Sequence, residues 1–239
     1  MKVTTDSCLF GAIVVAKIED RKPACSKGVL SDQQARSKIQ NVLDVGTGTG
    51  LLSLMLVQKH PGLRIDAIEI DKASAAQARE NAEASSWKDR INVIHADIKT
   101  CSFSKKYDLM ISNPPFYENE LRSPETKKNF ARHGDALLFE ELLAIIRKNL
   151  APGGLFFLLL PFRRTEEIKN ILVRHEFAIS QLIFVRQSVH HDYFRIILTG
   201  KSDPGSGEAT VIDELSIRDE NNQYTKEFIQ LLKDYYLYL

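Results

Sequence analysis

Short apolar runs alternate with longer segments of helical periodicity along most of the chain. Each run has the length of a strand and ends at turn residues, which is typical of strands buried in a sheet. The predicted strands are Asn41–Val45, Arg64–Ile70, Ile91–Ala96, Tyr107–Ser112, Leu155–Leu160, Ile179–Val185 and Tyr193–Thr199. The predicted helices between them are Gly50–His60, Ala73–Ser85, Asp135–Leu150 and Thr165–His175. Alternating strands and helices predict a parallel sheet with right-handed crossovers.

The connection between the last two of these strands is too short for a parallel crossover. Only the segment Arg186–Asp192 separates them, whereas a parallel connection needs about a dozen residues or more. We therefore expect this pair to be antiparallel. The predicted fold is a Rossmann-like α/β fold with a seven-stranded, mostly parallel sheet and an antiparallel last strand.

The segments outside this pattern are interpreted as parts of a single domain spanning residues 1–239. Residues 1–38 are expected to form an N-terminal helix and a lid loop, 39–202 the Rossmann-like core, and 203–239 a C-terminal extension with one strand and one helix. The segments behind this division are a helix over Asp6–Ile18, a polar loop over Arg21–Lys38, a linker over Lys201–Glu208, a strand near Leu215–Ile217 and a helix from Thr225.

Composition and charge fit a globular protein without a uniformly basic surface. Hydrophobic residues make up 44% of the 239 residues. The 32 Lys and Arg residues nearly balance the 31 Asp and Glu residues, which gives a net charge of +1. A basic coat for nucleic acid is therefore excluded, although a local basic patch is not. The cysteines Cys8, Cys25 and Cys101 are scattered without a C-x-x-C pair, so we expect no disulfide framework and no metal site. The apolar stretch Leu9–Ile18 is too short to span a bilayer, and we expect a soluble cytoplasmic protein.

A glycine-rich loop and two acidic positions predict a nucleotide-like ligand site. The loop DVGTGTG, residues 44–50, joins the first strand to its helix, where glycines and free helix N–H groups can approach a ligand. Glu69 follows about 20 residues later, where an acid can accept both hydroxyls of a ribose. Asp97 ends the third strand, where it can meet an adenine amino group, although a simple cap of the following loop is an open alternative. Asp71 is interpreted as a cap of the next helix.

The tetrapeptide Asn113-Pro114-Pro115-Phe116 after the fourth strand is the sharpest chemical signal in the chain. Exocyclic amines of bases and amide nitrogens are poor nucleophiles because their lone pair is delocalised. Two acceptors, the Asn113 side-chain oxygen and the Pro114 carbonyl, can favour the pyramidal nitrogen of a transition state. The two prolines fix both acceptors, and Phe116 offers a face on which a planar base can stack. A merely rigid loop is the alternative for this tetrapeptide.

These residues resemble the class I S-adenosylmethionine-dependent methyltransferases over about residues 39–202. The G-x-G-x-G spacing and the tetrapeptide disfavour a dehydrogenase, the competing interpretation. The resemblance implies that Asp44 orients the methionine end of the cofactor. The core residues expected at the cofactor are Asp44, Gly46, Thr47, Gly48, Gly50, Glu69, Ile70, Asp97, Ile98 and Asn113.

The ends of the chain add a narrower resemblance. MKVTTDS at residues 1–7, NPPFY at 113–117, ARH at 131–133, YTKEF at 224–228 and DYYL at 234–237 resemble the bacterial tRNA(adenine-N6)-methyltransferases that act on valine tRNA. This resemblance implies methyl transfer to N6 of adenine 37, beside the anticodon, with Lys2 and Asp6 near the cofactor. Thr4 and Ser7 stand where glycine is more usual.

Basic residues gather in loops expected near the carboxyl ends of the strands, as a phosphate footprint would. Those expected to contact RNA are Lys27, Arg122, Lys127, Lys128, Arg132, Arg163, Arg164 and Arg186. We expect a monomer with tRNA as partner. Ribosomal-RNA guanine-N2 methylation, protein glutamine-N5 methylation and a non-catalytic nucleotide-binding adaptor stay open as alternatives.

Overall fold

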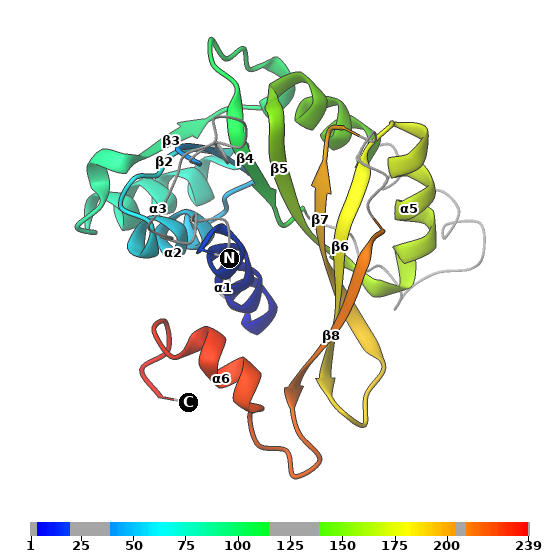
Figure 1. Cartoon of the computed structure of the whole chain (residues 1–239). Coiled ribbons are helices and arrows are strands. Elements are labelled where there is room, and N and C mark those ends of the chain that lie inside the picture. The colour runs from blue at the N-terminus through cyan, green and yellow to red at the C-terminus, as the bar shows by residue number, and fades with distance from the viewer. Residues whose placement is uncertain (1–3, 20–38, 115–138, 204–208, 239) are drawn as a thin grey trace, which may run out of the picture.

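Eight strands form one sheet in the order β3-β2-β1-β4-β5-β7-β6-β8 (Figure 1). The computed structural model describes residues 4–19, 39–114, 139–203 and 209–238. The strands are β1 Asn41–Val45, β2 Arg64–Glu69, β3 Ile91–His95, β4 Tyr107–Ser112, β5 Leu150–Pro161, β6 Ala178–Ser188, β7 Tyr193–Lys201 and β8 Val211–Arg218. Strand β7 runs antiparallel to both of its neighbours, β5 and β6, and the other neighbouring pairs are parallel. The predicted antiparallel pair is therefore confirmed.

The eighth strand corrects the predicted count of seven. Strand β8 pairs with β6 at the edge of the sheet instead of standing outside it. Its first four residues are exposed, whereas Leu215 and Ile217 are 2% exposed. Because only the second half has the alternation of a half-buried strand, the sequence predicted just that half.

Strand β5 also begins earlier than predicted. It begins at Leu150 rather than Leu155 and includes Pro152 and Gly153, and its pairing with β4 shifts register between Tyr107 and Leu109. Gly153 has a φ of 72°, a conformation that favours glycine. The first residues of β5 are thus an irregular part of the strand, which strand periodicity did not predict.

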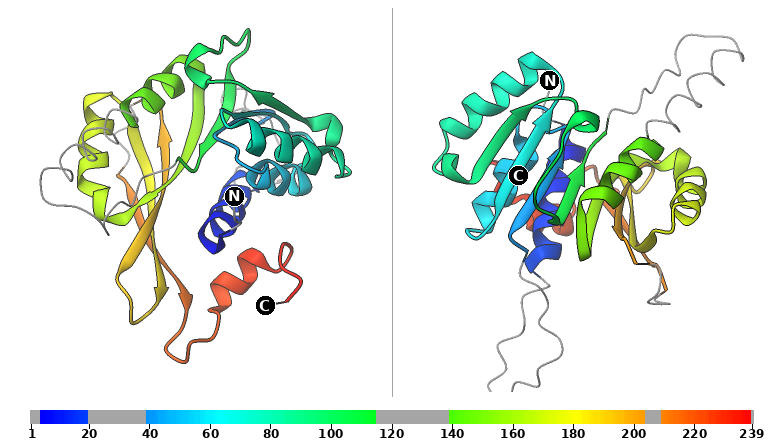
Figure 2. Two further views of the ribbon diagram at one scale, coloured as in Figure 1. Left: turned by 180° about the vertical axis from the view of Figure 1, so that it is seen from behind. Right: turned by 90° about the horizontal axis from the view of Figure 1, so that it is seen from above.

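Helices cover both faces of the sheet and define two cores. The helices are α1 Thr5–Glu19, α2 Leu51–Lys59, α3 Lys72–Glu83, α5 Thr165–Arg174 and α6 Lys226–Leu232, with a further helical stretch over residues 139–149. Helices α1, α2 and α6 pack on one face, and residues 139–149 with α5 pack on the other (Figure 2). The predicted start of the helix Asp135–Leu150 lies outside the described residues, and its end gives way to β5 at Leu150. In the described part of the chain, every helix is too short or too polar to cross a membrane.

Helix α1 is buried on almost every side. Nine of its fifteen residues are buried, because it lies between the sheet, α2 and α6 (Figure 1). At Gly11 an added Cβ would lie 2.6 Å from Met55 Sδ, so glycine allows the close approach of α1 to α2. This burial explains why the segment is continuously apolar rather than amphipathic.

The strand order places a switch point between β1 and β4. Strand β1 pairs with β2 on one side and β4 on the other, so the connections leave in opposite directions. Ligands of open α/β sheets bind at the carboxyl ends of strands at such a point. The glycine loop follows β1 and Asn113 follows β4, so both predicted motifs lie at this edge.

Candidate active site

The glycine loop folds back over the end of β2. The backbone N–H groups of Gly46 and Thr47 both donate to the carbonyl of Ile68, at 2.9 and 3.0 Å. Gly46 and Gly50 have φ values of 72° and 82°, which side chains with a Cβ rarely adopt. A Cβ at Gly46 would meet nothing within 4 Å, so the glycine is required by the backbone conformation. Gly46 lines a cavity, so at this position the backbone can approach a ligand, as the glycine loop predicted.

Asp44 is a fully buried carboxyl at this edge of the sheet. Its Oδ2 accepts hydrogen bonds from the hydroxyls of Thr47 and Ser53, both at 2.7 Å, whereas Oδ1 has no partner among the described residues. Burial, which withdraws the charge from water, raises the pKa of Asp44 to about 6 against the opposing effect of the two hydroxyls, and the charge of Glu69 adds to the rise. A buried carboxylate with an unpartnered oxygen is suited to pairing with a cation.

Glu69 ties the glycine loop to the start of α3. Its Oε2 accepts from the Gly48 N–H at 2.8 Å, and its Oε1 accepts from the Asp71 N–H at 2.9 Å. An ionised carboxylate has about four acceptor positions, so these two bonds leave capacity for two hydroxyls of a ligand. Asp71 caps α3 by accepting from the Ser74 N–H at 2.8 Å, which confirms its interpretation as a cap.

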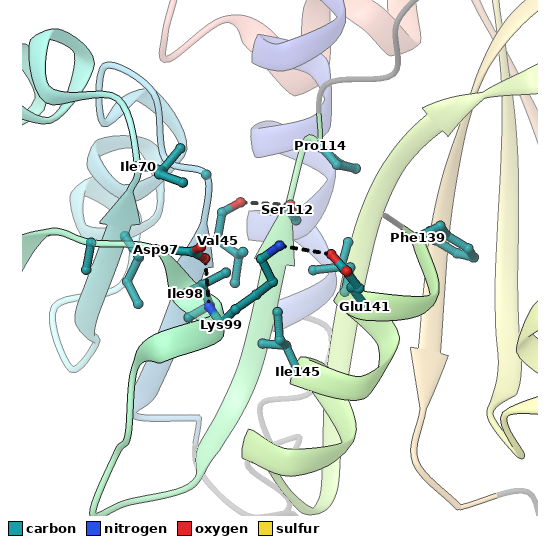
Figure 3. Close-up of a pocket in the computed structure, with 14 residues that line it drawn as sticks. Val45, Ile70, Asp97, Ile98, Lys99, Ser112, Pro114, Phe139, Glu141 and Ile145 are labelled. Atoms are coloured by element: carbon teal, nitrogen blue, oxygen red, sulfur yellow. Dashed lines mark hydrogen bonds and ion pairs between the residues drawn. The ribbon is translucent and has the colours of Figure 1, made fainter. Parts of the chain in front are cut away.

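A mostly apolar cavity of about 280 Å³ opens between the ends of β1, β2, β3 and β4 (Figure 3). Ile70, Asp97 and Ile98 form one wall, and the opposite wall is formed by Phe139, Glu141, Leu142 and Ile145. Predicted site residues gather here from distant parts of the sequence. The cavity is lined by Val45, Gly46, Ile68, Ile70, Ala96, Asp97, Ile98, Lys99, Ser112, Pro114, Phe139, Glu141, Leu142 and Ile145.

Asp97 caps a short helix and also lies at the cavity. Its Oδ1 accepts from the Lys99 N–H at 2.9 Å and so caps the short helix Ile98–Thr100. The residue also lines the cavity. An ion pair of 3.3 Å between Lys99 and Glu141 joins the two walls. Sequence reasoning missed Phe139 and Glu141, which follow a segment outside the described residues and carry no motif.

Asn113 is held by the first turn of α1. Its Nδ2 donates to the Ser7 hydroxyl at 3.0 Å. Its neighbours Ser112 and Pro114 both line the cavity, and the Ser112 hydroxyl donates to the carbonyl of Val45 at 2.7 Å. Pro115 and Phe116 lie outside the described residues, as does Lys2. The structure thus brings the N-terminal segment to the predicted acceptor amide, although the residue that touches it is Ser7 rather than Asp6.

Asp6 instead anchors this turn to β7. Its Oδ2 accepts from Arg195 Nε at 2.9 Å, and its Oδ1 accepts from the Ser7 N–H at 3.0 Å. Hydrogen bonds from Thr4 and Arg195, together with the Arg195 charge, outweigh the opposing effect of burial and lower the pKa of Asp6. Asp6 is therefore a structural anchor in this structure. Arg195 was not predicted, since an isolated arginine in a strand has no sequence signal.

The described basic residues occupy varied environments. Arg163 is exposed directly after β5, at the edge of the sheet that carries the cavity. Arg164 is mostly buried and forms two hydrogen bonds with Glu167, and Arg186 donates to Ser216 and lies over the Tyr193 ring. These two side chains are already engaged within the protein. The other predicted RNA contacts, Lys27, Arg122, Lys127, Lys128 and Arg132, lie outside the described residues.

The apolar walls and the two acidic side chains at this edge of the sheet suit an adenosine-like molecule that carries a cation. The cavity walls are apolar enough for a planar base, Glu69 can accept ribose hydroxyls, and the orphaned oxygen of Asp44 can pair with an ammonium group. S-adenosyl-L-methionine has these three parts, so the residues present fit it. Within the described residues, no cluster of three or more His, Cys, Asp or Glu is arranged to hold a metal.

Comparison with known sequences points to one group of enzymes. Residues 24–170 match the model of the methyltransferase small domain. The chain is 31% identical to the tRNA1(Val) (adenine(37)-N6)-methyltransferase of Pedobacter heparinus, over 99% of this chain and 92% of that protein. It is 34% identical to the protein of the same name from Bacteroides thetaiotaomicron, over 100% of this chain and 92% of that protein. The protein of that name from Proteus mirabilis is 35% identical, over 84% of this chain and 82% of that protein.

Solved structures agree on the fold. A predicted O-methyltransferase, Atu636 from Agrobacterium tumefaciens, superposes with a TM-score of 0.64 at 15% identity, covering 95% of each chain. TrmN from Thermus thermophilus superposes with a TM-score of 0.51 at 23% identity, covering 68% of this chain and 43% of that one. At these identities the likeness concerns the fold alone.

Proposed function

This chain belongs to the methyltransferase small domain family, and we propose that it methylates N6 of adenine 37 in valine tRNA with S-adenosyl-L-methionine as the methyl donor. Relatives from several bacteria that are named tRNA1(Val) (adenine(37)-N6)-methyltransferase, 31–36% identical over most of the chain, support this assignment. The observation that carries it in the structure is the position of Asn113 directly after β4, beside the cavity.

The cofactor residues have separate roles in this proposal. Asp44 pairs with the amino group at the methionine end, and Glu69 accepts the ribose hydroxyls while holding the Gly48 N–H. Asp97 and Ile98 line the space for the adenine ring. Bound S-adenosyl-L-methionine supplies an electrophilic methyl group. The apolar walls exclude water from the base and strengthen the few polar contacts.

Asn113 and Pro114 act on the target base. The side-chain oxygen of Asn113 and the carbonyl of Pro114 accept the two N6 hydrogens, which turns the nitrogen lone pair toward the methyl group. In this proposal Phe116 stacks on the base, and the proline ring at position 115 restricts the backbone φ there. A strong general base is unnecessary, because the nitrogen becomes acidic only once it is methylated. Alignment supplies most of the rate.

Phosphate contacts hold the tRNA beside this edge of the sheet in our proposal. Arg163, exposed after β5, supplies one such contact, and the predicted set outside the described residues supplies others. We also propose that the protein acts as a single-domain monomer. Its proposed compartment is the cytoplasm, where tRNA is modified.

Methylation of unmodified tRNA by the purified protein tests the proposal directly. We expect N6-methyladenosine at position 37 of valine tRNA, located by mass spectrometry of nuclease fragments. Asn113→Ala should lose turnover by about 100-fold or more while S-adenosylhomocysteine binding stays within a few-fold. Full activity of Asn113→Ala would refute the mechanism. Methylation of guanine-N2 in ribosomal RNA, or of a glutamine-containing peptide, in place of tRNA would refute the substrate.

A further inference from the structure

The acceptor amide of Asn113 has two chemically different ends, and only one of them serves the proposed reaction. Oδ1 accepts a hydrogen bond, whereas Nδ2 donates. A rotation of 180° about the terminal side-chain torsion of Asn113 would present Nδ2 to the amino group of adenine. Two hydrogen-bond donors would then face each other, and no hydrogen bond would form. Something in the protein therefore has to set the orientation of this amide.

We infer that the Ser7 hydroxyl is the positioning residue that holds the Asn113 amide with its oxygen available to the substrate, an inference that rests on the proposed function. Asn113 Nδ2 donates to Ser7 Oγ at 3.0 Å. Ser7 Oγ lies 2.9 Å from Thr4 Oγ1, and either hydroxyl can donate in this pair. When Ser7 donates to Thr4, its lone pair is left for Nδ2, and the hydrogen bonds run in one direction from Asn113 to Ser7 to Thr4.

The backbone under Ser7 is itself fixed. Asp6 Oδ1 accepts from the Ser7 N–H at 3.0 Å, and Arg195 holds the other oxygen of Asp6 at 2.9 Å. The two side chains of this ion pair are only 24% and 14% exposed, so the pair is partly shielded from water. The Cys8 N–H donates to the Thr4 carbonyl at 3.1 Å and closes the turn. The hydroxyl that meets Asn113 is thus anchored on β7, a strand distant from β4 in the sequence.

The hydroxyls of Thr4 and Ser7 affect only the orientation of the acceptor amide in this inference, and they take no part in the methyl transfer itself.

Two variants of Ser7 separate positioning from a structural role. Ser7→Ala removes the acceptor, and we expect kcat to fall about 3–10-fold while KM for tRNA and the affinity for S-adenosylhomocysteine change less than twofold. Ser7→Thr keeps the hydroxyl and should restore kcat. Ser180→Ala is the control, because it removes a partly buried hydroxyl that bonds the Thr199 carbonyl at the far end of β6. Unchanged kcat in Ser7→Ala, or an equal loss in Ser7→Thr, would overturn the inference.

A second readout needs no catalysis. The side-chain NH₂ signals of Asn113 can be assigned in a ¹⁵N spectrum of the free protein by their loss in Asn113→Ala. We expect these signals to shift in Ser7→Ala and to stay near their original positions in Ser180→Ala. If they do not move in Ser7→Ala, the contact is absent and the inference fails. A wild-type protein inactive on tRNA would refute the proposed function, whereas the NMR result would still decide the contact.

Discussion

Replacing Asp44 with asparagine should remove a pH-dependent instability that the wild-type protein carries. The carboxyl is fully buried, and burial raises its pKa to about 6 from the ordinary value of 3.8. At about 1.4 kcal/mol per pH unit, this difference corresponds to about 3 kcal/mol favouring the protonated form in the folded state. The ionised carboxyl at neutral pH therefore destabilises the fold by about that amount relative to the protonated carboxyl.

The direction of the pH dependence follows from proton binding. Because the folded state holds the Asp44 proton more tightly, this group makes the free energy of unfolding fall as the pH rises from about 4 to about 6, and it adds no slope above about 7. Asp44→Asn has no proton to lose here. The difference in unfolding free energy, variant minus wild type, should therefore rise by about 2.4 kcal/mol between pH 4 and 7.

Urea unfolding at several pH values, followed by the fluorescence of Trp87, the single tryptophan, measures this difference. Groups such as Asp6, whose pKa is lowered, titrate in both proteins and cancel in the comparison. The absolute stability of the variant includes a new unpartnered Nδ2 hydrogen, so the change with pH is the cleaner quantity. Parallel curves for the two proteins would refute the reasoning. The same variant should bind S-adenosylhomocysteine weakly, and undiminished affinity would refute the pairing of Asp44 with the amino group.

Three other results are expected. Glu69→Gln keeps the shape but replaces one acceptor by a donor, so calorimetry should show about tenfold or more weaker binding of S-adenosylhomocysteine, and equal affinity would count against the ribose contact. Tyr107→Phe removes the 2.7 Å hydrogen bond to buried Asp66 and should lower the unfolding free energy by about 1–3 kcal/mol without changing kcat, whereas an unchanged midpoint would contradict it. The affinity for tRNA should fall steeply with salt, and Arg163→Glu should reduce the log–log slope by about 0.7–1. Arg64→Glu, at the opposite edge of the sheet, should leave the slope unchanged, and a slope equal in both variants would argue against Arg163 as a phosphate contact.

The parts of the fold with a strong local signal were predicted from the sequence. Strand β4 has the predicted bounds, and the short hairpin identified β7 as antiparallel. The glycine loop adopts positive φ values where glycines stand, because that requirement is local to the backbone. Hydrophobic periodicity and turn residues predict such features locally, without knowledge of the rest of the chain.

The parts of the fold and of the site that depend on tertiary contacts were not predicted from the sequence. Ser53 bonds Asp44 across nine residues, and nothing in its own sequence context sets it apart. The departure at Ser7 was visible, but its contact with Asn113 spans 106 residues and required the packing of α1 to be known. Half of β8 was missed because an edge strand exposes residues that a central strand would bury.

The position of α1 between the sheet and α6 has a consequence for folding. Part of the apolar surface of α1 packs against residues that are distant in the sequence, among them Phe228 and Leu232. Contacts of large sequence separation form slowly, because the intervening chain has to be ordered before they stabilise the fold. The apolar surface of α1 that α6 covers would therefore stay open to water during folding, which favours aggregation of a chain that has not yet placed α6.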